Sequence, residues 1–366
     1  MKNKLLLKKW NLRYLVSLVV SIVLAFVIGA GILALSGFDP LEAYGAMLSG
    51  AFDSARHVGD FLEYAMVLCI CGLACVLGAR VGIFNVGGEG QLLLGAIFAC
   101  QVGIWMDGMS PWLVIPAAAL ASMAVGGFYA FIPGVLKVKV NEVITTIMLN
   151  TIAAYLCQYL AKGPWKNANK NMVAATEQLN AQYWFGNVIP RSSLSTAIFA
   201  AAIIAFIVWY VMQKTSRGFE MRLTGQNPRF ARFSGIRTDR LVILCMVISG
   251  AMCGLVGMFR VYGAEHLYRD SVSRDYYFEA LMVAMIAQYK PVTVIFLSLF
   301  FAVLKIGAQG MELIGVPSQI YLIIQTVIIF FMAAESGISA SLQASAQKRK
   351  ARLAAKARQK GDVQHG

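Results

Sequence analysis

Ten stretches of apolar residues constrain this chain more than any other feature of its sequence. A membrane-spanning helix needs roughly 20 predominantly apolar residues. The stretches cover residues 14–35, 61–77, 90–105, 112–136, 143–160, 194–212, 241–259, 277–287, 292–311 and 320–334. The second, third and eighth are short, so we expect them to use neighbouring residues or to form broken, re-entrant segments. The first exceeds the apolar core of about 7–15 residues in a cleaved signal peptide, which predicts a retained helix.

The composition leaves too few charges to cover a water-facing surface. Charged residues make up 14% of the 366 positions and hydrophobic residues 58%, whereas a soluble domain carries about 25% charged residues. The seven cysteines lie inside apolar stretches, and we interpret them as small buried side chains rather than metal ligands. These features predict an all-α integral membrane protein with one transmembrane domain over 1–340 and a basic tail over 341–366.

The basic residues gather on one side of the predicted spans. They cluster at the N-terminus, between 214 and 240 and in the tail, and the net charge is +14. An excess of Lys and Arg is typical of cytoplasmic loops, and this reading is preferred to nucleic-acid binding. We therefore expect ten spans with both termini cytoplasmic. The loop 260–275 fits least well, because it would lie outside and yet holds Arg260, Arg269 and Arg274, although the acidic residues Glu265, Asp270 and Asp275 accompany them.

The segment 82–91 combines glycines with an amide and a carboxylate at the expected edge of the bilayer. Glycine lets backbone segments approach closely. A helix interrupted there exposes backbone groups that are tolerated only inside protein or beside a water-filled cavity. A glycine-rich cytoplasmic turn is the alternative.

The segment 137–150 predicts a helix start followed by a buried amide. Asn141 or Thr145 is suited to cap the helix, and Glu142 then lies in the first turn, where the helix dipole favours an anion. Asn150 lies two turns deeper and needs a partner, either a polar solute or a neighbouring helix. From these two segments we predict the following residues of a substrate pathway: Phe84, Asn85, Glu89, Gln91, Glu142 and Asn150.

The longest predicted inside loop, 215–236, mixes arginines with aromatic residues. We expect a helix from Phe219 that breaks between Gly225 and Pro228 and restarts, giving a short helical hairpin. Arginine and aromatic side chains are enriched where proteins dock, although a basic loop without a partner is the alternative. The candidate docking residues are Arg217, Gly218, Arg222, Gly225, Asn227, Pro228, Arg229 and Gly235.

Two charged residues fall inside predicted spans, and no catalytic set accompanies them. A charge at mid-membrane costs on the order of 3 kcal/mol, so Glu279 and Lys305 are expected to pair, to face a cavity or to extend to an interface. We find no Gly-x-x-x-x-Gly-Lys-Ser/Thr phosphate loop, no nucleophile–base set and no metal cluster. The chain is therefore not expected to be an enzyme, and we predict no catalytic residue, metal ligand or cofactor in it.

Three phrases of the sequence resemble permeases of bacterial ATP-binding-cassette importers, in the family that serves ribose, other simple sugars, nucleosides and branched-chain amino acids. The family phrase Phe-Asn-Ile-Gly-x-Glu-Gly-Gln is matched at 84–91, and Glu-Val-Ile-x-Thr-Ile-Met-Leu-Asn at 142–150. The third, Gly-x-x-x-Arg-x-x-Gly-x-Asn-Pro with a following Gly-Ile, is matched at 218–228 and 235–236. The likeness extends to about residue 334. The nucleoside branch fits best, through the phrase at 142–150 and the long outside loop.

The resemblance implies a type II-like permease in the bacterial plasma membrane. It implies a second, homologous permease subunit, a cytoplasmic ATPase docked near 218–235, which uses ATP and Mg, and an extracellular lipoprotein or periplasmic protein that delivers a small polar solute. In one departure, alanine replaces the family's glycine at Ala280 and Ala287. The alternatives are a simple-sugar or branched-chain amino acid permease of the same family and an ion-coupled secondary transporter.

Overall fold

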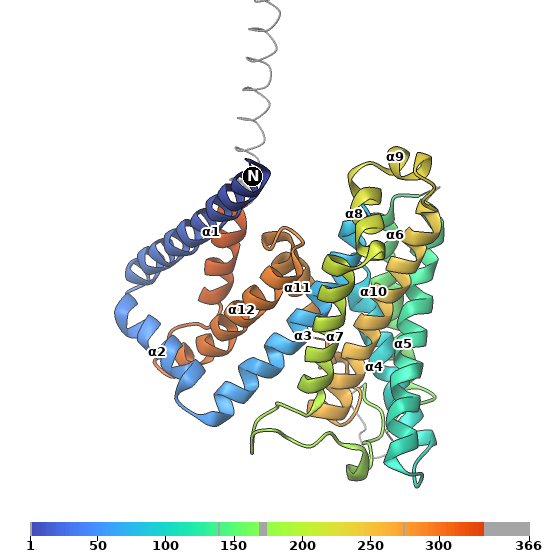
Figure 1. The fold of residues 1–366 in the computed structure, drawn as a ribbon. Helices are drawn as coiled ribbons and strands as arrows, with labels where there is room; N and C mark the ends of the chain where they lie inside the picture. The colour runs from blue at the N-terminus through green and yellow to red at the C-terminus, as the bar shows by residue number, and fades with distance from the viewer. Residues whose placement is uncertain (1, 138–139, 168–173, 274, 333–366) are drawn as a thin grey trace, which may run out of the picture. The chain divides into compact units, whose positions relative to one another are not determined.

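Helices form nearly all of the regular structure in the computed structural model (Figure 1). The structure describes residues 2–137, 140–167, 174–273 and 275–332. The helices are α1 (Lys2–Leu35), α2 (Pro40–Phe52), α3 (Ala55–Arg80), α4 (Gly88–Trp105), α5 (Pro111–Leu136), α6 (Glu142–Lys162), α7 (Ala197–Lys214), α8 (Ser216–Gln226), α9 (Pro228–Phe233), α10 (Thr238–Arg260), α11 (Tyr276–Ile286), α12 (Pro291–Glu312) and a further helix, Ile320–Met332. The described residues contain two isolated β-bridges and no strand.

The predicted all-α membrane fold is confirmed. The described part of every predicted apolar stretch lies mainly within a helix, and seven of these helices are long and apolar enough to cross a membrane. The second predicted stretch is extended by neighbouring residues, because the helix that contains it, α3, has 26 residues. The eighth stretch stays short, because its helix, α11, has only 11 residues. Helix α2 was not predicted.

The chain divides into two compact units, residues 1–45 with 314–366 and residues 46–313. Within the first unit, the Tyr44 hydroxyl donates a hydrogen bond of 2.7 Å to the carbonyl of Phe26. The side chain of Ile324 lies against Gly29. The predicted basic tail, 341–366, lies outside the described residues.

The core of the second unit forms around α10, which packs against α3, α4 and α5 (Figure 1). Close approach explains why α10 carries glycines on its packed face. A Cβ atom added to Gly254 would overlap the carbonyl of Ser122 on α5, and one on Gly257 would overlap the carbonyl of Leu92 on α4. Small residues are the usual means by which membrane helices pack backbone against backbone.

A buried ion cluster joins α3 to the end of α10. Arg260 binds Glu63 at 2.6 Å and Glu265 at 2.8 Å, and each of these three side chains is less than 10% exposed. Glu265 also pairs with Arg269 at 2.6 Å. In the loop 260–275, which fits the charge rule least well, Arg260 and Arg269 are thus each paired with a carboxylate, as the acidic residues of the loop suggested.

Glu279 and Lys305 pair with each other, which was one of the expected outcomes. Their side chains form an ion pair between α11 and α12. Tyr64 on α3 donates to Glu279, and the Lys305 ammonium donates to the Tyr64 hydroxyl at 2.7 Å. The charge of Lys305 is thus compensated where the three helices meet.

Candidate functional site

Most of the glycine-rich segment between α3 and α4 is buried in the protein, and Gly82 and Phe84 at its start are exposed. Val81, Ile83, Asn85, Val86 and Gly87 are buried. The interruption between the two helices thus lies where protein, rather than lipid, meets its backbone groups.

Side chains of this segment supply many of its own hydrogen bonds. The Asn85 amide donates to the Ser249 hydroxyl on α10 at 2.9 Å and to the Gln91 side chain at 3.1 Å. Its carbonyl oxygen accepts from the backbone N–H of Gly87 at 3.1 Å. The Tyr277 hydroxyl donates to the Asn85 backbone carbonyl. These contacts attach the interruption to α4, α10 and α11.

Asn150 on α6 finds its partners in the same segment. Its side-chain oxygen accepts from the backbone N–H of Gly90, and its amide donates to the carbonyl of Val86, both at 2.9 Å. Asn150 thereby satisfies one donor and one acceptor at the start of α4. The partner that the sequence required for this buried amide is therefore a neighbouring segment.

Beside Asn150 lies a cavity of about 610 Å³. It is bounded by α4, α6, residues 270–273 and 275, and the first turn of α11. Glu89 lies in its wall, where the carboxylate accepts from the Ser273 hydroxyl and from the backbone N–H of Tyr277. The other polar lining residues are Asn150, Thr151, Tyr155, Gln158, Asp270, Ser271, Ser273 and Asp275.

One face of α6 lines this cavity. Ile147, Thr151, Tyr155 and Gln158 line it and recur every three or four residues, so they lie on one face of the helix. Tyr155 is 68% exposed and Thr151 is also exposed. Exposed polar groups are unfavourable against lipid, so this face of α6 is suited to water or to a second protein.

Of the six residues predicted for a substrate pathway, two line the cavity and four do not. Glu89 and Asn150 line the cavity. Asn85 and Gln91 are buried in the hydrogen bonds described above, and Phe84 packs edge-on against Tyr289. Glu142 lies in the first turn of α6, which Asn141 caps by accepting from the backbone N–H of Val143 at 2.9 Å. Contact of any of these residues with a solute remains a prediction.

Several lining residues escaped the analysis of the sequence. The periodicity of polar residues along α6 was a usable signal for Tyr155 and Gln158. Asp270 had none, because it reaches the cavity from a three-residue 3-10 helix, Asp270–Val272, which is too short to show a periodic pattern. Partial burial raises the pKa of the Asp270 carboxyl, while the positive charge of Lys162 acts in the opposite direction.

The predicted helical hairpin is present as α8 and α9, at one end of the helices of this unit (Figure 1). It breaks at Asn227, whose side chain caps α9 by accepting from the backbone N–H of Phe230 at 3.0 Å. Pro228 occupies the first position of α9, where a missing N–H is tolerated. Gly235, with φ of +84°, follows α9 in the left-handed region that glycine adopts readily.

Two glycines place α8 directly on the ends of α3 and α7. A Cβ atom on Gly225 would overlap the carbonyl of Arg80, and one on Gly218 would overlap the carbonyls of Val211 and Met212. Arg222 donates to the same Met212 carbonyl. The position of the hairpin is thus set by backbone contact with two long helices.

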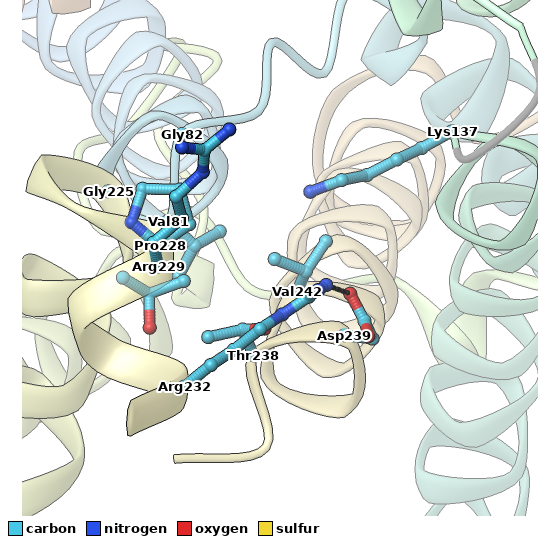
Figure 2. Close-up of a pocket in the computed structure, with 11 residues that line it drawn as sticks. Val81, Gly82, Lys137, Gly225, Pro228, Arg229, Arg232, Thr238, Asp239 and Val242 are labelled. Atoms are coloured by element: carbon cyan, nitrogen blue, oxygen red, sulfur yellow. Dashed lines mark hydrogen bonds and ion pairs between the residues drawn. The ribbon is translucent and has the colours of Figure 1, made fainter. Parts of the chain in front are cut away.

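The outer side of the hairpin is apolar and basic. Phe219, Phe230 and Phe233 are 58%, 55% and 92% exposed. Arg217 forms an ion pair of 2.9 Å with Glu220, and its side chain is 71% exposed. Arg229 lines a second pocket, between the hairpin and the start of α10 (Figure 2).

The protein is a helical membrane protein with a polar cavity beside a lightly buried span and an apolar and basic hairpin at one end. These features suit the membrane subunit of a transport system. The family model described as branched-chain amino acid transport system, permease component, matches residues 58–333. The chain belongs to this family, and the membership predicted from the three phrases is confirmed.

Three relatives resemble the chain over most of its length. A nucleoside ABC transporter permease of Lactococcus lactis is 32% identical over 86% of this chain and 89% of its own. A guanosine ABC transporter permease of Bacillus subtilis is 31% identical over 90% and 95%. A glucose ABC transporter permease of Haloferax volcanii is 32% identical over 86% of each chain. No solved structure matches the chain significantly.

Proposed function

We propose that this chain is the membrane-spanning permease subunit of an ATP-binding-cassette importer that brings nucleosides into the cell. The observation that carries the proposal is the polar face of α6 beside the 610 Å³ cavity. Two relatives named for nucleoside or guanosine transport support the substrate class. Family membership makes an ion-coupled secondary transporter the weaker alternative.

The chemistry of the cavity favours an uncharged solute with hydroxyl groups and a flat, apolar part. Tyr155 and Phe278 offer aromatic surface. Asp270, Gln158 and the serine hydroxyls offer hydrogen-bonding groups suited to a ribose. The carboxylates of Glu89, Asp270 and Asp275 line the cavity, and their negative charge disfavours nucleotides and other anions.

The partners follow from the same proposal. A cytoplasmic ATPase would dock on the α8–α9 hairpin and supply the ATP and Mg chemistry. A second, homologous permease subunit would cover the open face of α6 and complete the pathway. A lipoprotein or periplasmic binding protein would deliver solute from the other side. In the proposed orientation both termini would lie in the cytoplasm, which the basic clusters near the two ends of the chain support.

A simple sugar is the second candidate substrate, because the glucose permease relative is as similar to the chain as the nucleoside permease. Hydrogen-bonding groups would suit either solute. The aromatic surface and the second nucleoside-type relative favour the nucleoside.

Competition for uptake distinguishes these substrates. In cells that express the complete importer, excess unlabelled guanosine or uridine is expected to suppress uptake of labelled guanosine. Equal concentrations of ribose, glucose, leucine and guanosine monophosphate are expected to leave it nearly unchanged. Uptake should also stop when ATP is depleted and survive proton and sodium uncouplers. Suppression by glucose or leucine but not by nucleosides would overturn the substrate and leave the permease family standing.

A further inference from the structure

The second pocket lies where the α8–α9 hairpin meets the transmembrane helices, and its volume is about 360 Å³. We call it the hairpin pocket. Its walls come from the turn after α3, the residue after α5, both hairpin helices and the first turn of α10 (Figure 2). Small-molecule sites range from about 300 to 1,000 Å³, so the pocket can hold a small ligand group.

Positive charge dominates the hairpin pocket. Lys137, Arg229 and Arg232 line it, and the side chain of Lys137 extends into it from the end of α5 (Figure 2). The carboxylate in the wall, Asp239, is paired with Arg232 at 2.7 Å. Among the described residues, neither Lys137 nor Arg229 forms an ion pair. Two cations of the pocket therefore have no ion-pair partner among the described residues.

Thr224 adds a buried hydroxyl without a partner. It lines the pocket and is 2% exposed, and its oxygen makes no hydrogen bond to any described residue. A buried polar group left without a hydrogen bond typically costs about 1–3 kcal/mol. The oxygen itself is enclosed, so the Thr224 side chain would have to rotate to bring this hydroxyl to a ligand oxygen in the pocket, which would then accept its proton and remove the deficit.

Two further features favour an anion. The first turn of α10, a helix of 23 residues, contributes Thr238 and Asp239 to the wall, and a helix N-terminus attracts negative charge. Partial burial lowers the pKa of the Lys137 ammonium, and the neighbouring Arg232 acts in the same direction, although Glu142 and Asp239 oppose it. A bound anion would restore the solvation that Lys137 has partly lost.

We propose that the hairpin pocket binds a phosphate group through Lys137, Arg229 and the Thr224 hydroxyl. The phosphate belongs either to the headgroup of an anionic lipid or to a free phosphate ion. The pocket lies at the ends of α3 and α5 and at the start of α10, where apolar spans give way to polar residues and where lipid headgroups would lie. A phosphate held there would join the hairpin to α5 and α10. The proposal does not depend on the transported solute.

Titration calorimetry on the purified full chain in a non-ionic detergent tests the site. The probes are short-chain phosphatidylglycerol, short-chain phosphatidylcholine and inorganic phosphate. The variants are Lys137→Gln, Arg229→Gln and Thr224→Val. Arg240→Gln is the matched control, because Arg240 is exposed in the first turn of α10 and lines a separate pocket. Thr224→Ser keeps the hydroxyl and reports whether position 224 tolerates substitution.

We expect one saturable site for phosphatidylglycerol or for inorganic phosphate in the wild-type chain. The dissociation constant should rise by about tenfold or more in Lys137→Gln and Arg229→Gln and several-fold in Thr224→Val, and stay within about twofold in Arg240→Gln and Thr224→Ser. Saturation by phosphatidylglycerol alone assigns the site to a lipid headgroup, and saturation by inorganic phosphate assigns it to the free ion. The proposal is overturned if no probe binds, or if Arg240→Gln loses as much affinity for the probe as the pocket variants do.

Discussion

Gly225→Val is expected to reduce ATP-driven uptake by about tenfold or more while the chain remains in the membrane. The Cβ atom would overlap the carbonyl of Arg80, and this neighbour is backbone that cannot turn aside as a side chain can. Overpacking of this kind costs about 1–3 kcal/mol, and 1.4 kcal/mol corresponds to a tenfold change in an equilibrium constant. The strain is relieved by moving α8, and with it the surface proposed to receive the ATPase.

The measurement is uptake of labelled solute, together with the amounts of permease in the membrane and of ATPase that co-purifies with it. Gly45→Val is the control, because Gly45 is also helical and nothing lies within 4 Å of its added Cβ. We expect this control to transport normally. Normal uptake and normal ATPase recovery in Gly225→Val would exclude the hairpin as the coupling element.

Arg260→Gln is expected to destabilise the protein more than any surface change. Removing the guanidinium leaves Glu63 and Glu265 buried without this shared cation, and breaking a buried ion pair from one side costs about 3–5 kcal/mol. The Arg260 guanidinium also lies 5.1 Å from the ring centre of Tyr276, a cation–π contact that glutamine does not provide. The expected result is a markedly lower melting temperature and poor yield in detergent.

The comparison variants isolate the cause of that loss. Arg217→Gln breaks an ion pair in which the arginine side chain is 71% exposed, and its effect should stay below about 1 kcal/mol. The double variant Arg260→Gln with Glu63→Gln should recover part of the stability, because it removes one of the carboxylates left without Arg260. Equal melting temperatures for Arg260→Gln and Arg217→Gln would refute the structural role of the cluster.

The sequence predicted well those features that depend on local pattern. Apolar stretches located the spans, since hydrophobic length is read directly from the chain. The break predicted between Gly225 and Pro228 lies at Asn227, and Asn141 is the one of the two candidate residues that caps α6. Both asparagine side chains bond to nearby backbone, which is a local property of the sequence. The prediction that Glu279 and Lys305 compensate each other was one of three alternatives, and their pairing decided among them.

Features that depend on distant contacts were not predicted from the sequence. Asn150 was expected to need a partner, but only the packing of α4 against α6 shows that it bonds to Val86 and Gly90. Asp270 reaches the cavity from a 3-10 helix of three residues, which is too short to show periodicity. Glu63 and Arg260 are separated by almost 200 residues, and no local rule joins them.

Labelling of a cysteine introduced at Thr151 tests most directly whether the cavity face of α6 lies on the solute path. The chain is expressed with its importer partners and treated with a charged, membrane-impermeant thiol reagent, and the wild-type chain supplies the background from the native cysteines. Phe206→Cys, on the apolar and 60% exposed surface of α7, is the matched control for a lipid-facing position. We predict that Thr151→Cys reacts, that excess guanosine slows the reaction severalfold, and that Phe206→Cys stays unlabelled. A Thr151→Cys chain that does not react, or that reacts equally fast with and without guanosine, would contradict the proposed path.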